Sequence, residues 1–173
     1  GGTGGFAVPL AEAGHRVTVV DPSPDSLAAL QRRAAERGLT DRVAGLQGDL
    51  SDLPVLIEPG STDVVLCHSV LEVVDDPVAA LAAVAGCLRT GGRLSLLVAN
   101  RDAAVLAPVL VTGAGLVAEQ VHGVRTVADL VPSAVLDTEP GAAAALLALE
   151  RALSDRPPFR DLATQLHLLA VRS

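Results

Sequence analysis

The fold is decided near the amino terminus, by the stretch GGTGGFAVPLAEAGHRVTVVDP at residues 1–22. A cluster of glycines at residues 1–5 precedes a segment that is predicted to be helical over residues 6–13. Glycine lets the backbone come close to a ligand, and the first turn of a helix offers free N–H groups. The short apolar run at residues 16–20 then predicts a buried parallel strand that ends at Asp21. We therefore expect a ligand site between the glycine loop and this carboxylate.

Strands and helices alternate downstream of this stretch. Ser23 is expected to cap a helix that has Pro24 in its first turn and that Gly38 ends in a left-handed conformation. Residues 51–60 are predicted to form an irregular connection, and residues 89–92 a turn. Further strands are predicted at residues 43–46, 63–67, 93–99, 116–121 and 165–171, and further helices at residues 77–88, 103–111 and 142–153. This alternation is typical of an α/β fold with a doubly wound parallel sheet, and we expect the C-terminal strand to form an edge of it.

Composition indicates a single domain over residues 1–173, with a formal net charge of −7. The sequence has neither an apolar run of about 18 residues nor a signal peptide, so we expect a soluble, cytoplasmic protein without a membrane span. Cys67 and Cys87 are predicted to be buried thiols, and no metal site is expected. Because the sequence contains no Met, we expect its N-terminal part to be incomplete.

Two acidic residues that follow predicted strands are candidates for binding an adenosine-type ligand. Asp21 can accept hydrogen bonds from both ribose hydroxyls, an interaction worth about 1.5–3 kcal/mol. Asp49 can accept a hydrogen bond from the adenine amino group while Leu50 packs on the ring. Either carboxylate can instead serve the local structure alone, Asp21 by capping the helix after Pro22 and Asp49 by capping a turn. A Walker loop is excluded because the chain contains no lysine.

Taken together, the motifs of residues 1–100 resemble those of class I S-adenosylmethionine-dependent methyltransferases. The residues that carry the resemblance are Gly2-Thr3-Gly4, Asp21, Gly48-Asp49-Leu50, Asp63-Val64-Val65-Leu66-Cys67-His68 and Leu88-Arg89-Thr90-Gly91-Gly92-Arg93-Leu94. The resemblance implies a Rossmann-like sheet with an antiparallel last strand. It also implies that the first strand of the sheet belongs upstream of Gly1 and is missing from this chain.

The same resemblance implies S-adenosyl-L-methionine as the cofactor and S-adenosyl-L-homocysteine as its product. It places Gly2 and Gly4 at the amino-acid part of the cofactor. It places Asp21, followed by Pro22, at the ribose. Asp49 and Leu50 would flank adenine, and His68 would lie beside the sulfonium.

A narrower resemblance, to tRNA 5-carboxymethoxyuridine methyltransferases, extends past residue 100. It is carried by residues 68–77, Asn100, Gly123-Val124-Arg125 with Asp129, and residues 145–150. That branch esterifies the carboxylate of a modified wobble uridine, so the resemblance implies a tRNA acceptor and makes Asn100 a candidate substrate-binding residue. Arg101 and Arg125 can hold a substrate carboxylate or phosphate, or they can be ordinary surface arginines. Members of that branch have a longer insertion before residue 116, so we expect residues to be missing near 112–115.

The chemistry of methyl transfer leaves the acceptor open. A methyl sulfonium is already activated, so the enzyme mainly aligns a nucleophile and excludes water. A carboxylate acceptor is ionised at neutral pH, whereas a hydroxyl needs a general base, for which His68 is the candidate unless it merely lines the cofactor cleft.

Charge does not favour RNA as the partner. Residues 1–100 carry 12 acids and 7 arginines, and residues 101–173 carry 8 acids and 6 arginines, so neither part is basic. The expected function is therefore methyl transfer to a carboxylate or hydroxyl oxygen, on either a modified tRNA uridine or a small molecule. A catalytically silent adenosine-binding module is the alternative from another class.

Overall fold

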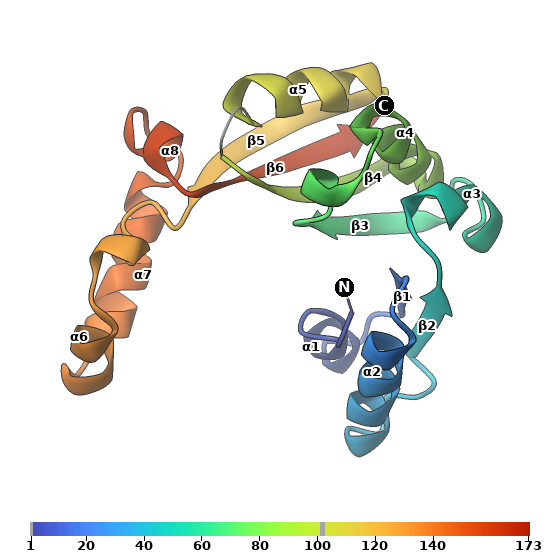
Figure 1. The fold of residues 1–173 in the computed structure, drawn as a ribbon, viewed down its shortest axis with the longest axis horizontal. Coiled ribbons are helices and arrows are strands. Elements are labelled where there is room, and N and C mark those ends of the chain that lie inside the picture. Colours follow the sequence, from blue (N-terminus) through green and yellow to red (C-terminus); the bar gives the residue numbers. More distant parts are fainter. Residues whose placement is uncertain (1, 101–102) are drawn as a thin grey trace.

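The computed structural model describes residues 2–100 and 103–173, and in helix α5 it describes side chains from residue 107 onward. Figure 1 shows the α/β architecture. The strands are β1 Val17–Asp21, β2 Val43–Gln47, β3 Thr62–His68, β4 Leu88–Ala99, β5 Leu116–Val124 and β6 Gln165–Arg172. The α-helices are α1 Ala7–Glu12, α2 Pro24–Glu36, α3 Leu53–Leu56, α4 Pro77–Cys87, α5 Ala103–Gly113, α6 Ser133–Thr138, α7 Ala142–Leu153 and α8 Phe159–Leu162. Short 3₁₀ helices are η1 Leu50–Asp52, η2 Leu71–Val73 and η3 Ala128–Leu130.

The strands form two sheets. β1 and β2 pair in parallel, and the second sheet has the order β3-β4-β6-β5. In that sheet β3 and β4 are parallel, whereas β6 is antiparallel to both β4 and β5. The prediction of an antiparallel last strand is confirmed. The prediction that it forms an edge is wrong, because β6 lies between β4 and β5 and leaves β5 at the edge.

Local signals in the sequence explain the helix ends. The hydroxyl of Ser23 accepts a hydrogen bond of 3.2 Å from the backbone N–H of Ser26 and so caps α2, as predicted. Gly38 follows α2 with a φ of +67°, which is the expected left-handed position. Asp76 caps α4 by accepting from the backbone N–H groups of Val78 and Ala79. These elements therefore form where the capping residues place them.

The predicted turn at residues 89–92 lies inside a strand. β4 begins at Leu88, directly after α4, and pairs there with Thr62 of β3. The next pair in register joins Val64 to Arg93, so residues 89–92 bulge outward opposite Asp63. Pairing is parallel to β3 on both sides of this bulge, so the predicted turn is a bulge within β4 rather than a turn that precedes the strand. The connection at residues 51–60, predicted to be irregular, contains the short helix α3.

The main hydrophobic core lies on one face of the four-stranded sheet, which α4 and α5 cover (Figure 1). Leu94 and Leu96 of β4 and Leu168 of β6 are fully buried on this face. On the opposite face of β3, the side chains of Val64 and Leu66 are 54% and 39% exposed. Smaller clusters join α1 and α2 to β1 and β2. The sheet therefore has one packed face and one open face.

Both cysteines lie in the main core as free thiols, as the sequence predicted. Burial raises the pKa of Cys67 to about 11, with a further contribution from Glu72. In the part of the chain that the structure describes, no helix combines the length and the apolar character needed to cross a membrane.

Candidate functional site

The glycine loop closes directly onto the end of β1. The backbone N–H of Gly2 donates a hydrogen bond of 3.1 Å to Oδ2 of Asp21. Gly2 has a φ of +35°, and a Cβ at this position would lie 3.2 Å from the same carboxylate oxygen. Gly4 has a φ of +90°, and a Cβ there would lie 2.7 Å from Cδ1 of Leu30. The left-handed backbone conformation favours glycine at both positions, and at Gly4 a side chain would also overlap the buried Leu30.

The Asp21 carboxylate has acceptor capacity to spare. Its Oδ1 accepts a hydrogen bond of 2.9 Å from the backbone N–H of Ser23, and its Oδ2 accepts the one from Gly2. Each carboxylate oxygen can accept two hydrogen bonds, so both oxygens can still receive a donor from a ligand. The helix cap is the side chain of Ser23 rather than Asp21. Pro22, between them, is exposed.

The end of β2 lies beside Asp21. The backbone N–H of Gly48 donates to the carbonyl oxygen of Asp21 across 3.3 Å, which brings the next residue, Asp49, to the same edge. Oδ1 of Asp49 accepts from both the hydroxyl and the backbone N–H of Ser51, at 2.6 and 2.7 Å. These two bonds lower the pKa of Asp49, and they give it the turn-capping role left open by the sequence. Leu50 is half-buried against the main core. Whether either residue also contacts adenine stays a prediction.

His68 ends β3 next to the glycine loop. The ring of Phe6 meets the ring of His68 edge-on, with 5.0 Å between the ring centroids. Since Phe6 directly follows the loop that binds Asp21, the described contacts bring three predicted positions, Gly2, Asp21 and His68, into one region. Burial, followed by the neighbouring His167, lowers the pKa of His68. This shift favours the neutral form of the ring, the form in which a histidine can accept a proton.

The structure adds two residues that sequence reasoning missed. Nε2 of His68 and Oγ of Ser95 are 2.9 Å apart, and Oγ of Ser95 and Nε2 of His167 are 2.7 Å apart. The signal was present in the strand alternation, because Ser95 and His167 are polar residues inside otherwise apolar strands. Their partners lie 27 and 72 residues away along the chain, so only strand register reveals the contacts.

The predicted substrate-binding residues have structural partners. The side-chain amide of Asn100 donates to the backbone carbonyls of Asp161 and Ala163, and so ties the end of β4 to the start of β6. Arg125 forms an ion pair with Asp129 through its Nε, at 3.0 Å. Arg101 lies outside the described residues. A substrate role for these three residues stays a prediction.

Arg125 borders a depression of about 370 Å³ at the start of the C-terminal helices. Beside it, the carboxylate of Glu150 accepts hydrogen bonds from the backbone N–H groups of residues 126–128. Burial opposes ionisation of Glu150, but these three donors outweigh it and lower its pKa. The residues that line the depression are Arg125, Thr126, Val127, Asp129, Leu130, Phe159, Leu162 and Thr164.

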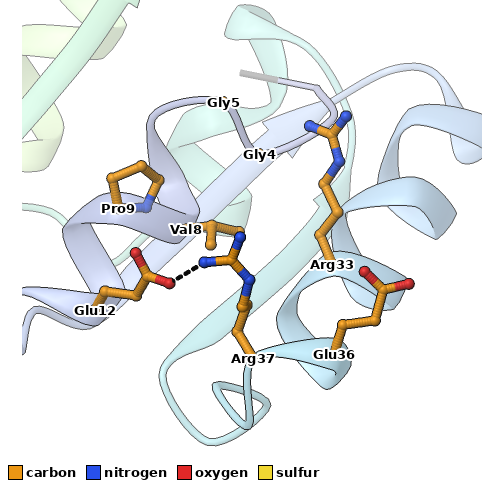
Figure 2. Close-up of a pocket in the computed structure, with 8 residues that line it drawn as sticks. All are labelled: Gly4, Gly5, Val8, Pro9, Glu12, Arg33, Glu36 and Arg37. Atoms are coloured by element: carbon orange, nitrogen blue, oxygen red, sulfur yellow. Dashed lines mark hydrogen bonds and ion pairs between the residues drawn. The ribbon is translucent and has the colours of Figure 1, made fainter.

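A second depression, of about 310 Å³, lies between α1 and α2 (Figure 2). Glu12 and Arg37 form an ion pair across it. It shares Gly4 and Gly5 with the glycine loop, but Asp21 and His68 do not line it. This hollow is therefore not the predicted ligand site. Among the described residues, no group of three or more His, Cys, Asp or Glu side chains is placed to hold a metal ion.

Sequence comparisons with known proteins identify a family and several relatives. A family model described as a methyltransferase domain matches residues 1–96. The chain is 34% identical over 100 residues to a tRNA 5-carboxymethoxyuridine methyltransferase of Escherichia coli strain K12, a match that covers 58% of this chain and 38% of that protein. It is also 34% identical over 117 residues to a ubiquinone biosynthesis O-methyltransferase of Xanthomonas euvesicatoria pv. vesicatoria strain 85-10, which covers 68% of this chain and 47% of that protein. These matches span less than half the length of either relative.

The fold is shared with solved structures at lower identity. A geranyl diphosphate methyltransferase solved in complex with SAM superimposes with a TM-score of 0.71 at 20% identity, over 99% of this chain and 75% of that one. At this identity the likeness concerns the fold, and it agrees with the Rossmann-like architecture predicted from the sequence.

Proposed function

Because the chain belongs to the methyltransferase domain family, we propose that it transfers the methyl group of S-adenosylmethionine to an oxygen atom of an acceptor. The acceptor oxygen belongs to a carboxylate or a hydroxyl. The observation that carries this proposal is the hydrogen bond between Gly2 and Asp21, which joins the glycine loop to the acidic end of β1.

The residues at this edge fit the cofactor. A Cβ at Gly2 would lie 3.2 Å from Asp21, so the absence of a side chain keeps backbone and carboxylate together. Spare lone pairs on Asp21 suit a ribose diol, since two hydroxyls can donate to one carboxylate. Asp49, at the neighbouring strand end, has a pKa lowered by its bonds to Ser51, and its carboxylate can accept a hydrogen bond from the adenine amino group.

When bound, the cofactor supplies an activated methyl group on a sulfonium. The chain's own residues then have three tasks. They bind the nucleoside, orient the acceptor and take up the proton that the acceptor loses. Asp21 and Asp49 bind the nucleoside of the cofactor, and Gly2 and Gly4 leave room for its amino-acid part. His68, which lies next to the glycine loop and has a lowered pKa, is our candidate to accept the acceptor's proton.

Sequence relatives support two kinds of acceptor. One is named for a tRNA nucleoside and the other for ubiquinone biosynthesis. The charge of −7 favours a small molecule over tRNA, because RNA binding is driven by basic surfaces. A catalytically silent adenosine-binding module is the competing proposal. It is supported by the scarcity of aromatic residues, of which the chain has only Phe6 and Phe159, to line a substrate pocket.

Two measurements test the proposal. Isothermal titration of the 173-residue chain with S-adenosylhomocysteine should give saturable binding. Transfer of a radiolabelled methyl group should then be followed with catechol, phenoxyacetate and total tRNA as acceptors. Transfer to any of these supports the enzyme. Saturable binding without transfer favours the silent module, and failure to bind S-adenosylhomocysteine contradicts both.

A further inference from the structure

A row of polar side chains crosses the four-stranded sheet. It consists of His68 on β3, Ser95 on β4, His167 on β6 and His122 on β5. His68 and His167 are both register partners of Leu97, one on each side of β4. Strand residues alternate between faces, so Ser95, two positions before Leu97, shares their face. The row is closed by the stacked rings of His122 and His167, whose centroids are 6.0 Å apart.

The single proton of the Ser95 hydroxyl makes the two hydrogen bonds directional. Oγ of Ser95 bonds to Nε2 of His68 at 2.9 Å and to Nε2 of His167 at 2.7 Å. With both rings neutral, the single hydroxyl proton can serve at most one ring, so at least one ring donates to Oγ through its Nε2–H. Either His68 donates to Ser95, or His68 accepts from Ser95 and His167 donates to it.

The other nitrogen of His68 decides between these arrangements. Nδ1 of His68 is buried and has no hydrogen-bond partner among the described residues. If His68 donates through Nε2, this Nδ1 is a bare lone pair. If His68 accepts at Nε2, Nδ1 instead carries a buried N–H group without an acceptor, which is rarer and costs more. The first arrangement is therefore favoured, with His68 donating to Ser95 through Nε2.

We propose that Ser95 and His167 position His68 as a general base, and that the methyl acceptor is therefore an alcohol or a phenol rather than a carboxylate. This inference rests on the proposed function. In the step, the acceptor O–H proton moves to Nδ1 of His68 and the acceptor oxygen bonds to the methyl carbon. The bond from that carbon to sulfur breaks and leaves its electron pair on sulfur. The His68 imidazolium keeps its Nε2–H bond to Ser95 and later releases the added proton to water.

The lone pair on Nδ1 of His68 distinguishes a hydroxyl acceptor from a carboxylate acceptor. A hydroxyl can donate to Nδ1 of His68, and this hydrogen bond lies on the path of proton transfer. A carboxylate is ionised at neutral pH and has no proton to donate. Its oxygen would face the Nδ1 lone pair as one acceptor against another. A carboxylate therefore gains nothing from a histidine held in this tautomer.

The surroundings of His68 suit a base. His167 faces it across β4, with His122 behind, and burial together with His167 lowers the pKa of His68. The carboxylate of Glu72, which acts on the neighbouring Cys67, accepts a hydrogen bond from the backbone N–H of Ala99. The ring against His68 on the side of α1 is Phe6, which is apolar and 58% exposed. Because Phe6 is so exposed, an acceptor can displace its side chain with little loss of packing.

Nitrogen NMR of the histidines tests the positioning without cofactor. The chain has only four histidines, so long-range ¹H–¹⁵N spectra of histidine-labelled protein resolve each ring. We expect His68 at pH 7 as the neutral Nε2–H tautomer. Ser95→Ala should turn it into a tautomer mixture, and Ser95→Thr, which keeps the hydroxyl, should restore it. The control His15→Gln, at an exposed position, should remove one signal and change no other. An Nδ1–H tautomer in the unmodified chain, or no response to Ser95→Ala, overturns the proposal.

Acceptor assays test the substrate class. With catechol as the probe, Ser95→Ala should lower kcat by roughly 2- to 10-fold, because only part of the His68 population keeps Nδ1 free to accept the proton, with the KM for S-adenosylmethionine unchanged. Ser95→Thr should recover most of the rate. Transfer to phenoxyacetate alone, at a rate indifferent to Ser95→Ala, overturns the inference and leaves the proposed function intact. If S-adenosylhomocysteine binds but neither probe nor tRNA is methylated, the proposed function fails and the acceptor assignment fails with it.

Discussion

The backbone N–H of Gly2 lies 3.1 Å from Oδ2 of Asp21, so a residue of the glycine loop and the last residue of β1 form one unit. The bond spans 19 positions of the chain. It joins the two features that the sequence singles out for cofactor binding. A change at either residue should therefore affect the same binding event.

Asp21→Ala should weaken S-adenosylhomocysteine binding by about 10- to 100-fold. The reason is the loss of a charge-assisted interaction with the ribose, worth about 1.5–3 kcal/mol. Isothermal titration measures the change. Asp25→Ala, which removes an exposed carboxylate in the first turn of α2, is the matched control and should bind like the unmodified chain. Equal affinity of the Asp21 and Asp25 variants would remove Asp21 from the site.

Gly4→Ala should destabilise the chain by about 1–3 kcal/mol, because the new methyl group would overlap Leu30 and the left-handed backbone disfavours a side chain. Thermal unfolding followed by circular dichroism measures the effect. The adjacent Gly5→Ala is the control, since a Cβ there meets no atom within 4 Å. A melting temperature for the Gly4 variant equal to that of the Gly5 variant would contradict the described packing.

Glu150→Ala should lower the free energy of unfolding by about 1–3 kcal/mol, because three backbone N–H groups at residues 126–128 lose their acceptor. For a chain of this size that is roughly 2–4 °C per kcal/mol in the melting temperature. The pKa of Glu150 lies below its ordinary 4.5, so its stabilisation is complete above that pH and is lost as the pH falls through the lowered pKa.

The exposed Glu139→Ala serves as the control for Glu150. It should leave both the melting temperature and its pH dependence nearly unchanged. The two variants should converge in stability at a pH low enough to protonate both carboxyls. A constant gap between them down to that pH would mean that Glu150 acts through packing alone.

Stability should fall as the pH drops below about 6.5, the ordinary pKa of histidine. The pKa values of His68 and His167 are both lowered by burial, so the unfolded chain binds more protons than the folded one in this window. Urea unfolding at pH 7.5 and pH 5.5 measures the difference. The double variant His68→Gln, His167→Gln should flatten the dependence, whereas His15→Gln should keep it. If the double variant keeps the full pH dependence of stability, that dependence does not come from His68 and His167.

Much of the fold follows from local signals. The predicted limits of α7 match the structure, and β1 and α2 differ by only a residue or so, because apolar period, caps and turn residues act within a few positions. The short helices α6 and α8 went unpredicted, since four to six residues carry little periodic signal.

The order of the strands in the sheet could not be predicted from such local signals. The alternation in β6 predicts a strand but does not say which neighbours it pairs with. Pairing with β4 along one edge and β5 along the other puts β6 inside the sheet, and Leu166, Leu168 and Ala170 on its core-facing side are almost fully buried there.

The sequence by itself determined the glycine loop, Asp21 at the end of its strand and the alternation that makes the fold α/β. Each of these depends on the conformational preference of a few adjacent residues. Only the tertiary structure decided that Ser95 stands between His68 and His167, and that the amide of Asn100 holds backbone carbonyls. Those contacts depend on the register of strands far apart in the chain, and register is set by packing of the whole sheet rather than by any local stretch.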